Sequence, residues 1–363
     1  MIPQYEPVML KEHAEAVYNQ VLSGWIGPGE AVKEFEQAIA DYTGSHYAIA
    51  TSSGTAALYC VIASVNLKRE ALVDGYSSFN VENSPVAIPS YGFPAAVNCV
   101  RSLGMKPILV DISKETLCIN PKKLRLLLEN YWSEVVIFVN HNGYVGPDLV
   151  EAKSICDKYG SLLIEDAACA LGQFYGGKHA GTFGQAGVFS FSVPKILTTG
   201  QGGMIITDDP AIAERCKEIV DQGSTNWRKD GYHKNFGLNF KMSDINAALG
   251  LSQMKQLETM MGVRQRIHDN YKERLLDLNY FPSDKPHGPW MNILIDCNAK
   301  LLREKLLSYN IQAKQYYRPI ADATGIAGGL DENARWAYER CLYLPSSLNL
   351  QEKTIQTICG VIN

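Results

Sequence analysis

Apolar residues recur at helical spacing in two stretches near the start of the chain, and each stretch stops at a glycine. The first runs from Leu10 to Leu22 and stops at Gly24, and the second runs from Glu30 to Tyr42 and stops at Gly44. Apolar residues three or four positions apart form one face of a helix, and glycine is common directly after a helix ends. We therefore expect the chain to open with two amphipathic helices.

Short runs of consecutive apolar residues follow and alternate with segments of helical spacing. Apolar residues at every position, rather than at every second one, are typical of strands covered on both faces. Asn120 before Pro121 is a common helix start, because asparagine caps the first turn and proline fits its first position. Strands that alternate with helices predict a mostly parallel α/β sheet. The runs are Tyr47–Ala50, Val86–Ile88, Pro107–Val110, Val135–Val139 and Leu162–Ile164.

The last third of the chain has a different pattern. A long stretch of helical spacing begins near Ser243 and continues toward Ile267, and shorter helix and strand patterns follow it. We interpret the long stretch as a bridge between two domains. The sequence thus predicts a large α/β domain over residues 1–245, and a bridging helix with a small α+β domain over residues 246–363.

Composition excludes several classes of protein. The 363 residues carry 34 Lys and Arg against 38 Asp and Glu, so no basic field exists to attract nucleic acid. The chain does not start with a basic segment followed by an apolar one, and no apolar run is as long as a membrane span, so we expect a cytoplasmic protein without membrane contact. The nine cysteines contain no CxxC pair and the seven histidines no HExxH motif, so we predict no metal site.

Lys195 and Asp166 are the most informative charged residues. Apolar runs at Gly187–Phe191 and Gly203–Thr207 flank the lysine and place it on a loop between strands, while Asp166 follows the strand predicted at Leu162–Ile164. A lysine amine can form a Schiff base with the aldehyde of pyridoxal phosphate, and a carboxylate can keep the ring nitrogen of that cofactor protonated. The alternative is a solvated loop lysine and an aspartate that caps a helix.

A phosphate site is predicted where the segment Thr51–Leu58 leaves a strand and enters a helix. The backbone amides of Gly54, Thr55 and Ala56 would point toward an anion, with the positive end of the helix dipole behind them. Alone, a Ser-Ser-Gly-Thr sequence is more often an ordinary helix cap. Its combination with the lysine and the aspartate favours phosphate binding.

Two more residues complete the predicted cofactor site. Phe93 follows a predicted strand, where its ring could stack on the pyridine ring, and Tyr91 is the second candidate for that place. An aromatic residue after a strand is otherwise part of the core. Ser190, shortly before Lys195, could donate a hydrogen bond to the phosphate.

In this order and at these spacings, the segments resemble the DegT/DnrJ/EryC1/StrS family of sugar aminotransferases, which are fold-type I pyridoxal phosphate enzymes. The resemblance covers essentially the whole chain. It implies a large domain with a mostly parallel central sheet, a small C-terminal α+β domain, and a homodimer with shared active sites. The segments that carry it are Ser23–Gly29, Phe35–Glu36, Ser53–Leu58, Glu165–Ala168, Ser190–Phe191, Gly237–Ala248 and Leu344–Pro345.

The resemblance also implies a role for each candidate. Lys195 would hold the cofactor and, once an amino donor has displaced it, act as the general base. The amino donor is usually L-glutamate in this family, and the acceptor is a ketosugar that is often linked to a nucleotide. The aminated sugar would be used to make surface polysaccharide, such as the O-antigen of lipopolysaccharide, or other deoxyaminosugars. Asp166 would contact the ring nitrogen and Phe93 the ring face. The phosphate would be bound by Gly54, Thr55 and Ser190, and by Asn239 of the partner subunit.

Several positions depart from the family pattern. Cys169 stands where Gln or His usually contacts the ring hydroxyl of the cofactor, and a thiol is a poorer hydrogen-bond partner. Gln201 replaces a more common Glu, and Lys241 replaces a more common Arg. The segment Tyr316–Asp322 lacks the His often found there. These differences indicate an unusual subgroup.

Two other functions fit the same resemblance. Dehydratases in the family remove a hydroxyl from a ketosugar, but the best-known kind carries His in place of the lysine, so Lys195 favours transamination. A regulator that only binds the cofactor would be favoured by loss of Lys195 or Asp166, and both are present.

The acceptor site is the least defined part. The diphosphate of a nucleotide-linked sugar needs positive groups, and the best candidates are Arg228 and Lys229 beside Trp227, whose ring could stack on a base. Arg318 is a further candidate. Each of these cations is more often a plain surface charge.

Overall fold

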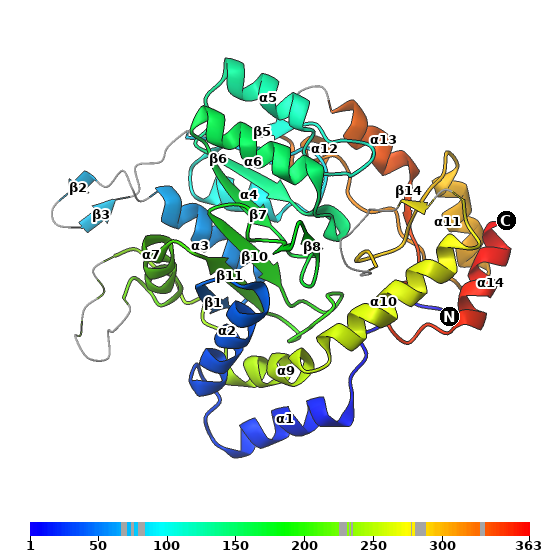
Figure 1. The fold of residues 1–363 in the computed structure, drawn as a ribbon, viewed down its shortest axis with the longest axis horizontal. Helices are drawn as coiled ribbons and strands as arrows, with labels where there is room; N and C mark the ends of the chain where they lie inside the picture. Colours follow the sequence, from blue (N-terminus) through cyan, green and yellow to red (C-terminus); the bar gives the residue numbers. More distant parts are fainter. Residues whose placement is uncertain are drawn as a thin grey trace.

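A seven-stranded sheet forms the centre of the molecule (Figure 1). The computed structural model describes residues 1–66, 71–73, 76–78, 84–224, 231, 233, 235–276, 278–279, 288–326 and 331–363. The strand order is β1-β11-β10-β7-β6-β4-β5, and β11 is antiparallel to both of its neighbours while the other pairs are parallel. The strands are β1 (Tyr47–Thr51), β4 (Pro85–Pro89), β5 (Lys106–Val110), β6 (Val135–Val139), β7 (Leu162–Asp166), β10 (Ala186–Ser190) and β11 (Gly203–Thr207).

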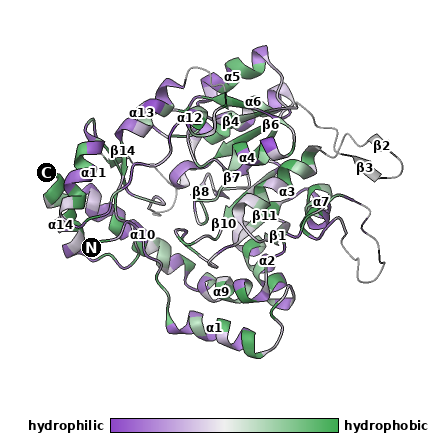
Figure 2. Ribbon diagram, turned by 180° about the vertical axis from the view of Figure 1, so that it is seen from behind, coloured by the Kyte–Doolittle hydropathy of each residue, from purple (hydrophilic) through white to green (hydrophobic). Residues whose placement is uncertain are grey.

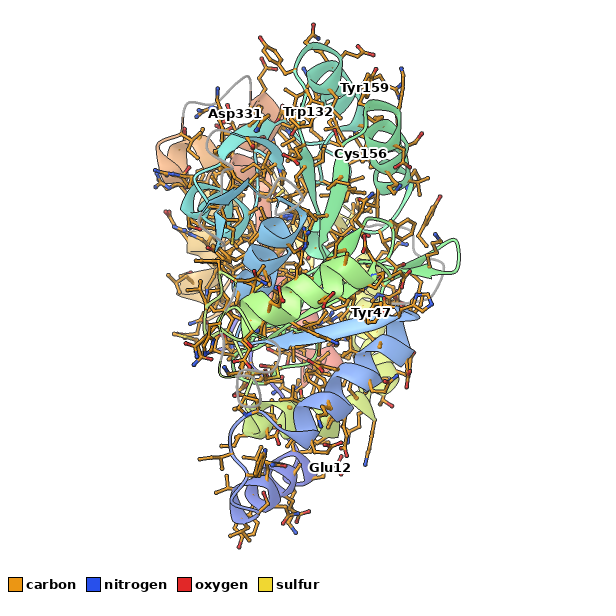
Figure 3. All side chains as sticks on the ribbon, turned by 90° about the vertical axis from the view of Figure 1, so that its left-hand side faces the viewer. Glu12, Tyr47, Trp132, Cys156, Tyr159 and Asp331 are labelled. Carbon is orange, nitrogen blue, oxygen red and sulfur yellow. The ribbon has the colours of Figure 1, made fainter. Side chains whose placement is uncertain are left out.

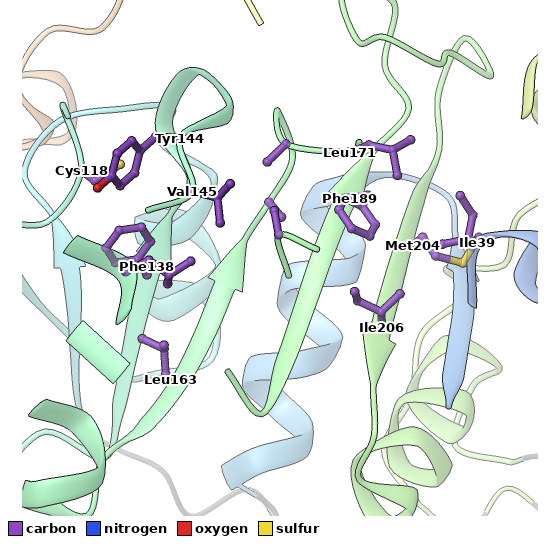
Figure 4. Close-up of a cluster of buried hydrophobic side chains, with 14 of the residues drawn as sticks. Ile39, Cys118, Phe138, Tyr144, Val145, Leu163, Leu171, Phe189, Met204 and Ile206 are labelled. Carbon is purple, nitrogen blue, oxygen red and sulfur yellow. The ribbon is translucent and has the colours of Figure 1, made fainter. Parts of the chain in front are cut away.

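The sheet is covered on both faces, which explains its continuous apolar strands. In β6, Val136 and Phe138 face one hydrophobic core, while Val135 and Ile137 face another. Figure 4 shows part of the first core, with side chains from four adjacent strands in a row. The mostly parallel α/β sheet predicted from the sequence is confirmed. The first core is covered by α2 (Glu30–Thr43), α5 (Pro121–Asn130) and α6 (Pro147–Tyr159), and the second by α3 (Gly54–Asn66), α4 (Ala95–Ser102) and α7 (Pro210–Val220).

Both predicted N-terminal helices are present. Helix α1 (Lys11–Leu22) packs against α9 (Asp244–Met254), and α9 also packs against α2. In Figure 3, α1, marked by Glu12, lies at the opposite end of the molecule from α6, marked by Tyr159. Seen from behind and coloured by hydropathy, the outer helices carry both hydrophilic and hydrophobic residues (Figure 2), as helices with one buried face do.

The long helix expected from Ser243 to Ile267 is two helices. Helix α9 ends at Met254, the amide of Gln256 donates to the carbonyl of Gln253 in a tighter turn, and α10 (Leu257–Lys272) follows. Helix α10 packs against the C-terminal helix α14 (Glu352–Ile362), whereas the main contacts of α9 are with α1 and α2. The predicted division between residues 245 and 246 stays a prediction.

The C-terminal part contains a small antiparallel sheet beside a separate core. Its strands are β12 (Leu278–Asn279), β13 (Ile293–Ile295) and β14 (Cys341–Tyr343), and α11 (Ala299–Ser308), α10 and α14 pack around them. Two further helices, α12 (Ile320–Thr324) and α13 (Glu332–Arg340), return to the large sheet: Ile320 joins the second core.

No helix among the described residues is both long and apolar enough to cross a membrane. Short elements are the hairpins β2 (Ala71–Val73) with β3 (Tyr76–Ser78) and β8 (Phe174–Tyr175) with β9 (Lys178–His179), and the turn η2 (His141–Gly143).

Candidate active site

A cavity of ≈ 430 Å³ lies where several parallel strands end. Val139 ends β6, Asp166 ends β7 and Ser190 ends β10, and all three line it. Ligands of open α/β sheets bind at the carboxyl ends of the strands, because loops from neighbouring strands meet there. The predicted site residues that line this cavity are Gly54, Thr55, Phe93, Asp166, Cys169, Ser190 and Lys195.

The amine of Lys195 projects into the cavity between a thiol and an indole. Its Nζ donates to Sγ of Cys169 at 2.9 Å and lies 4.6 Å from the ring centre of Trp290. The backbone is held as well, because the hydroxyl of Tyr5 donates to the carbonyl of Lys195 at 2.9 Å. The lysine therefore occupies a defined place on its loop, as a residue that holds a cofactor needs to.

Asp166 and Glu165 point to opposite sides of β7, and only Asp166 lines the cavity. Burial raises the pKa of the Asp166 carboxyl, while the amide of Ala168 and the charge of Lys195 act in the opposite direction. Glu165 is fully buried and accepts three backbone hydrogen bonds, from Gly181, Phe183 and Gly184. Glu165 thus fixes the chain that leads into β10, and Asp166 is the carboxylate available to a ligand.

The predicted phosphate cradle lies at the start of α3. Gly54 and Thr55 line the cavity, and a Cβ on Gly54 would lie 2.8 Å from Cβ of Ser190, so only glycine lets the two segments approach. The amide of Ala56 donates to Oγ of Ser53 at 3.1 Å, which is the capping alternative. Gly54 and Thr55 are therefore the predicted phosphate residues at the cavity, whereas the amide of Ala56 is used in the helix cap.

Phe93, rather than Tyr91, is at the cavity surface. The side chain of Phe93 is 66% exposed and lines the cavity, whereas Tyr91 is buried and donates to the carbonyl of Tyr316. A large exposed ring at the edge of a cavity has free area for a flat ligand.

An aromatic wall, formed by His141, Trp290, Tyr316 and Tyr317, also lines the cavity, and sequence reasoning missed it. The Nε2 atom of His141 and the hydroxyl of Tyr343 are 2.8 Å apart. Burial, and next the charge of Lys195, lower the pKa of His141 to about 3. Tyr317 has φ of 56°, which is uncommon for a bulky residue, and such strained conformations cluster at active sites and ligand-binding segments.

The remaining predicted residues lie elsewhere. Asn239 is exposed and does not line the cavity of its own chain. Arg318 is exposed, with its guanidinium 5.8 Å from the ring centre of Tyr338, and it does not line the cavity either. The predicted substrate residues Trp227, Arg228 and Lys229 lie outside the described residues. The described part of the chain contains no group of three His, Cys, Asp or Glu side chains able to hold a metal.

These residues fit pyridoxal phosphate. The cavity offers an amine for its aldehyde, a carboxylate for its ring nitrogen and a glycine at a helix start for its phosphate, at Lys195, Asp166 and Gly54. When bound, this cofactor supplies an electron sink for a substrate carbanion.

A family model described as the DegT/DnrJ/EryC1/StrS aminotransferase family matches residues 7–363. The chain belongs to this family. It is a fold-type I aminotransferase with pyridoxal phosphate as its cofactor, as the sequence predicted.

Individual members of the family agree with this assignment. The chain is 28% identical to GDP-perosamine synthase of Escherichia coli O157:H7, over 100% of this chain and 98% of the relative. The aminotransferase TlmJ of Streptoalloteichus hindustanus superposes with a TM-score of 0.88 at 25% identity, covering 100% of this chain and 98% of that one. GDP-4-keto-6-deoxymannose-3-dehydratase (ColD) superposes with a TM-score of 0.89 over 100% of both chains, but at 21% identity it supports the fold alone.

Proposed function

We propose that this aminotransferase moves an amino group from L-glutamate to the keto carbon of a nucleotide-linked deoxy-ketosugar. The observation that carries the proposal is the amine of Lys195, held at 2.9 Å from Cys169 in the same cavity as Asp166. A family relative named GDP-perosamine synthase supports a sugar acceptor. The product would serve surface polysaccharide such as O-antigen in lipopolysaccharide, or another deoxyaminosugar, and the cytoplasm is the location we propose.

The residues of this chain divide the work between them. The amine of Lys195 takes the proton from the donor carbon and returns it, because it is the one lysine or arginine side chain that lines the cavity among the described residues. The carboxylate of Asp166 would keep the ring nitrogen of pyridoxal phosphate protonated. The aromatic wall excludes water and presents ring faces, which suit the apolar face of a deoxysugar.

Transamination is favoured over the dehydratase alternative by the lysine itself. A structural relative is a ketosugar dehydratase, so the fold permits both reactions. The resemblance seen in the sequence implies histidine at this position in the best-known kind of dehydratase, and this chain has Lys195 there. A regulator without catalysis is disfavoured because both Lys195 and Asp166 line the cavity.

We infer a homodimer with shared active sites. Apolar side chains are exposed on α1 and directly after it, where a soluble surface is normally polar. Phe93 is exposed beside the cavity, and Asn239 is exposed away from it. A second subunit would cover these apolar side chains and bring its own Asn239 to the phosphate. The exposed apolar residues are Tyr18, Val21, Leu22, Trp25 and Ile26.

The proposal is tested by the visible absorbance of the purified enzyme. We expect a band from lysine-bound cofactor that is lost when L-glutamate is added and is absent from Lys195→Ala. Borohydride added without glutamate should fix the cofactor on the peptide that contains Lys195. A band that ignores glutamate would contradict the donor and favour dehydration, and turnover by Lys195→Ala would refute the role of the lysine.

A further inference from the structure

The contact between Cys169 and Lys195 places a thiol directly beside an essential amine. The two residues come from loops that follow β7 and β10, which are parallel neighbours with Asp166 opposite Val188. The sheet therefore fixes the distance between the two loops, and Nζ and Sγ lie 2.9 Å apart. A thiol at this place can do something that an amide or an imidazole cannot, because its sulfur can be oxidised.

Cys169 is accessible where most cysteines of the chain are not. All nine cysteines lie in described parts of the chain: Cys297 is exposed, Cys169 is half-buried, and the other seven are buried. Cys169 also lines the cavity, so a small oxidant such as hydrogen peroxide reaches its sulfur by the route that a substrate uses. Cys297 is exposed as well, and it provides a natural control.

Two further side chains shape the surroundings of the sulfur. The indole of Trp290 lies over the Lys195 amine at 4.6 Å and restricts its movement. The guanidinium of Arg264 is 4% exposed, interacts electrostatically with Cys169, and has no hydrogen-bond partner for Nε or Nη2 within the described structure. The positive charge of Arg264 therefore favours the negative charge that the sulfur carries when it reacts with peroxide.

We propose that Cys169 and Lys195 form a reversible N–S cross-link when the enzyme meets hydrogen peroxide. The sulfur first takes one oxygen from peroxide, giving a sulfenic acid and water. The neutral amine then attacks the sulfur, an N–S bond forms, the S–O bond breaks, and the hydroxyl leaves as a second water with a proton of the amine. The sulfur is oxidised, the peroxide is reduced, and the protein loses two hydrogen atoms.

The cross-link and the cofactor compete for the same amine. A cross-linked Lys195 cannot hold pyridoxal phosphate, so peroxide disables the enzyme until a thiol attacks the N–S bond and releases both side chains. Holding the two groups in contact makes the second step effectively intramolecular, which favours it over further oxidation of the sulfur. The cross-link depends on the fold and the cofactor of the family and is independent of the amino donor and the acceptor proposed above.

The test treats the purified full-length enzyme with hydrogen peroxide and maps its peptides by mass spectrometry. We expect a joined peptide that contains Cys169 and Lys195, lighter than the sum of its parts by two hydrogen atoms and absent after dithiothreitol. The absorbance of lysine-bound cofactor should fall with peroxide and return with dithiothreitol. Excess pyridoxal phosphate, or prior reduction with borohydride, should lower the yield because the amine is then occupied.

Variants separate this cross-link from general oxidation. Cys297→Ser should give the joined peptide in the same yield as the unaltered enzyme, while Cys169→Ser and Lys195→Ala should give none. A Cys169 recovered only as free thiol or as sulfinic acid, with the Lys195 peptide unmodified, would overturn the proposal. So would a loss of cofactor absorbance that is the same in Cys169→Ser as in the unaltered enzyme.

Discussion

Asp244 lies at the start of α9, which joins the start of α2 to the loop after Lys195. It is 1% exposed, and its Oδ1 accepts from the amides of Gly29 at 2.8 Å and Val32 at 3.0 Å, at the start of α2. In the same first turn of α9, Asn246 donates to the carbonyl of Thr199 at 2.7 Å. Removing the carboxylate should therefore loosen α2 from α9, and with it the support of the loop after Lys195.

The magnitude follows from the two amides that lose their acceptor. A buried donor without a partner costs about 1–3 kcal/mol, and loss of a helix cap typically costs about 1 kcal/mol. For Asp244→Ala we expect the free energy of unfolding to fall by about 2–4 kcal/mol, since water can reach some of the freed groups. Asp244→Asn keeps Oδ1 and loses only the charge near the helix start, which is worth about 0.3–1 kcal/mol.

Urea denaturation followed by circular dichroism, at one protein concentration and with saturating cofactor, measures both variants against the unaltered enzyme. The reasoning requires a clear order, with Asp244→Asn close to the unaltered enzyme and Asp244→Ala well below it. Equal losses in the two variants would show that the charge, rather than the hydrogen bonds, matters. A loss below about 1 kcal/mol in Asp244→Ala would refute the account of two buried amides.

Two further predictions concern acid stability and assembly. The pKa of His141 is lowered to about 3, so the unfolded chain takes up a proton at this residue near pH 6.5 while the folded chain does not. The free energy of unfolding should therefore fall as pH drops from about 6.5 toward 3, by up to roughly 4 kcal/mol from this residue. The urea midpoint of His141→Phe should fall less steeply over that range than the midpoint of the unaltered enzyme. Equal pH dependence of the two midpoints would contradict this. Sedimentation should show a dimer, and mixing inactive Lys195→Ala and Asn239→Ala subunits should restore part of the turnover, whereas a monomer, or no recovery on mixing, would disprove shared sites.

The large sheet could be predicted from sequence because its strands are buried on both faces. Runs such as Val135–Val139 have no polar position, and β6 occupies those residues. The break between α9 and α10 could not be predicted in the same way. Lys255 and Gln256 are neither glycine nor proline, and apolar spacing continues through them, so only the packing of the two helices on different partners separates them.

The cofactor side of the site was predictable and the aromatic wall was not. Asp166 and Ser190 end strands, so the rule that sites lie at strand ends finds them. Trp290, Tyr316 and Tyr317 lie far along the chain, and an aromatic residue in an apolar segment is usually core. Only the return of the C-terminal part to the large sheet brings these rings to the cavity.

The charges around the cavity bear on how phosphate groups are bound. Among the described residues that line the cavity, Lys195 is the one cation, and the cofactor uses its amine. Lys241, which stands where the family more often has Arg, is paired with Asp221, and both side chains are about one quarter exposed. Neutral donors at Gly54 and Thr55 can bind one phosphate at the start of α3. The diphosphate of a nucleotide-linked acceptor would then need cations from outside this cavity. In our dimer proposal, the partner subunit is the source of these cations.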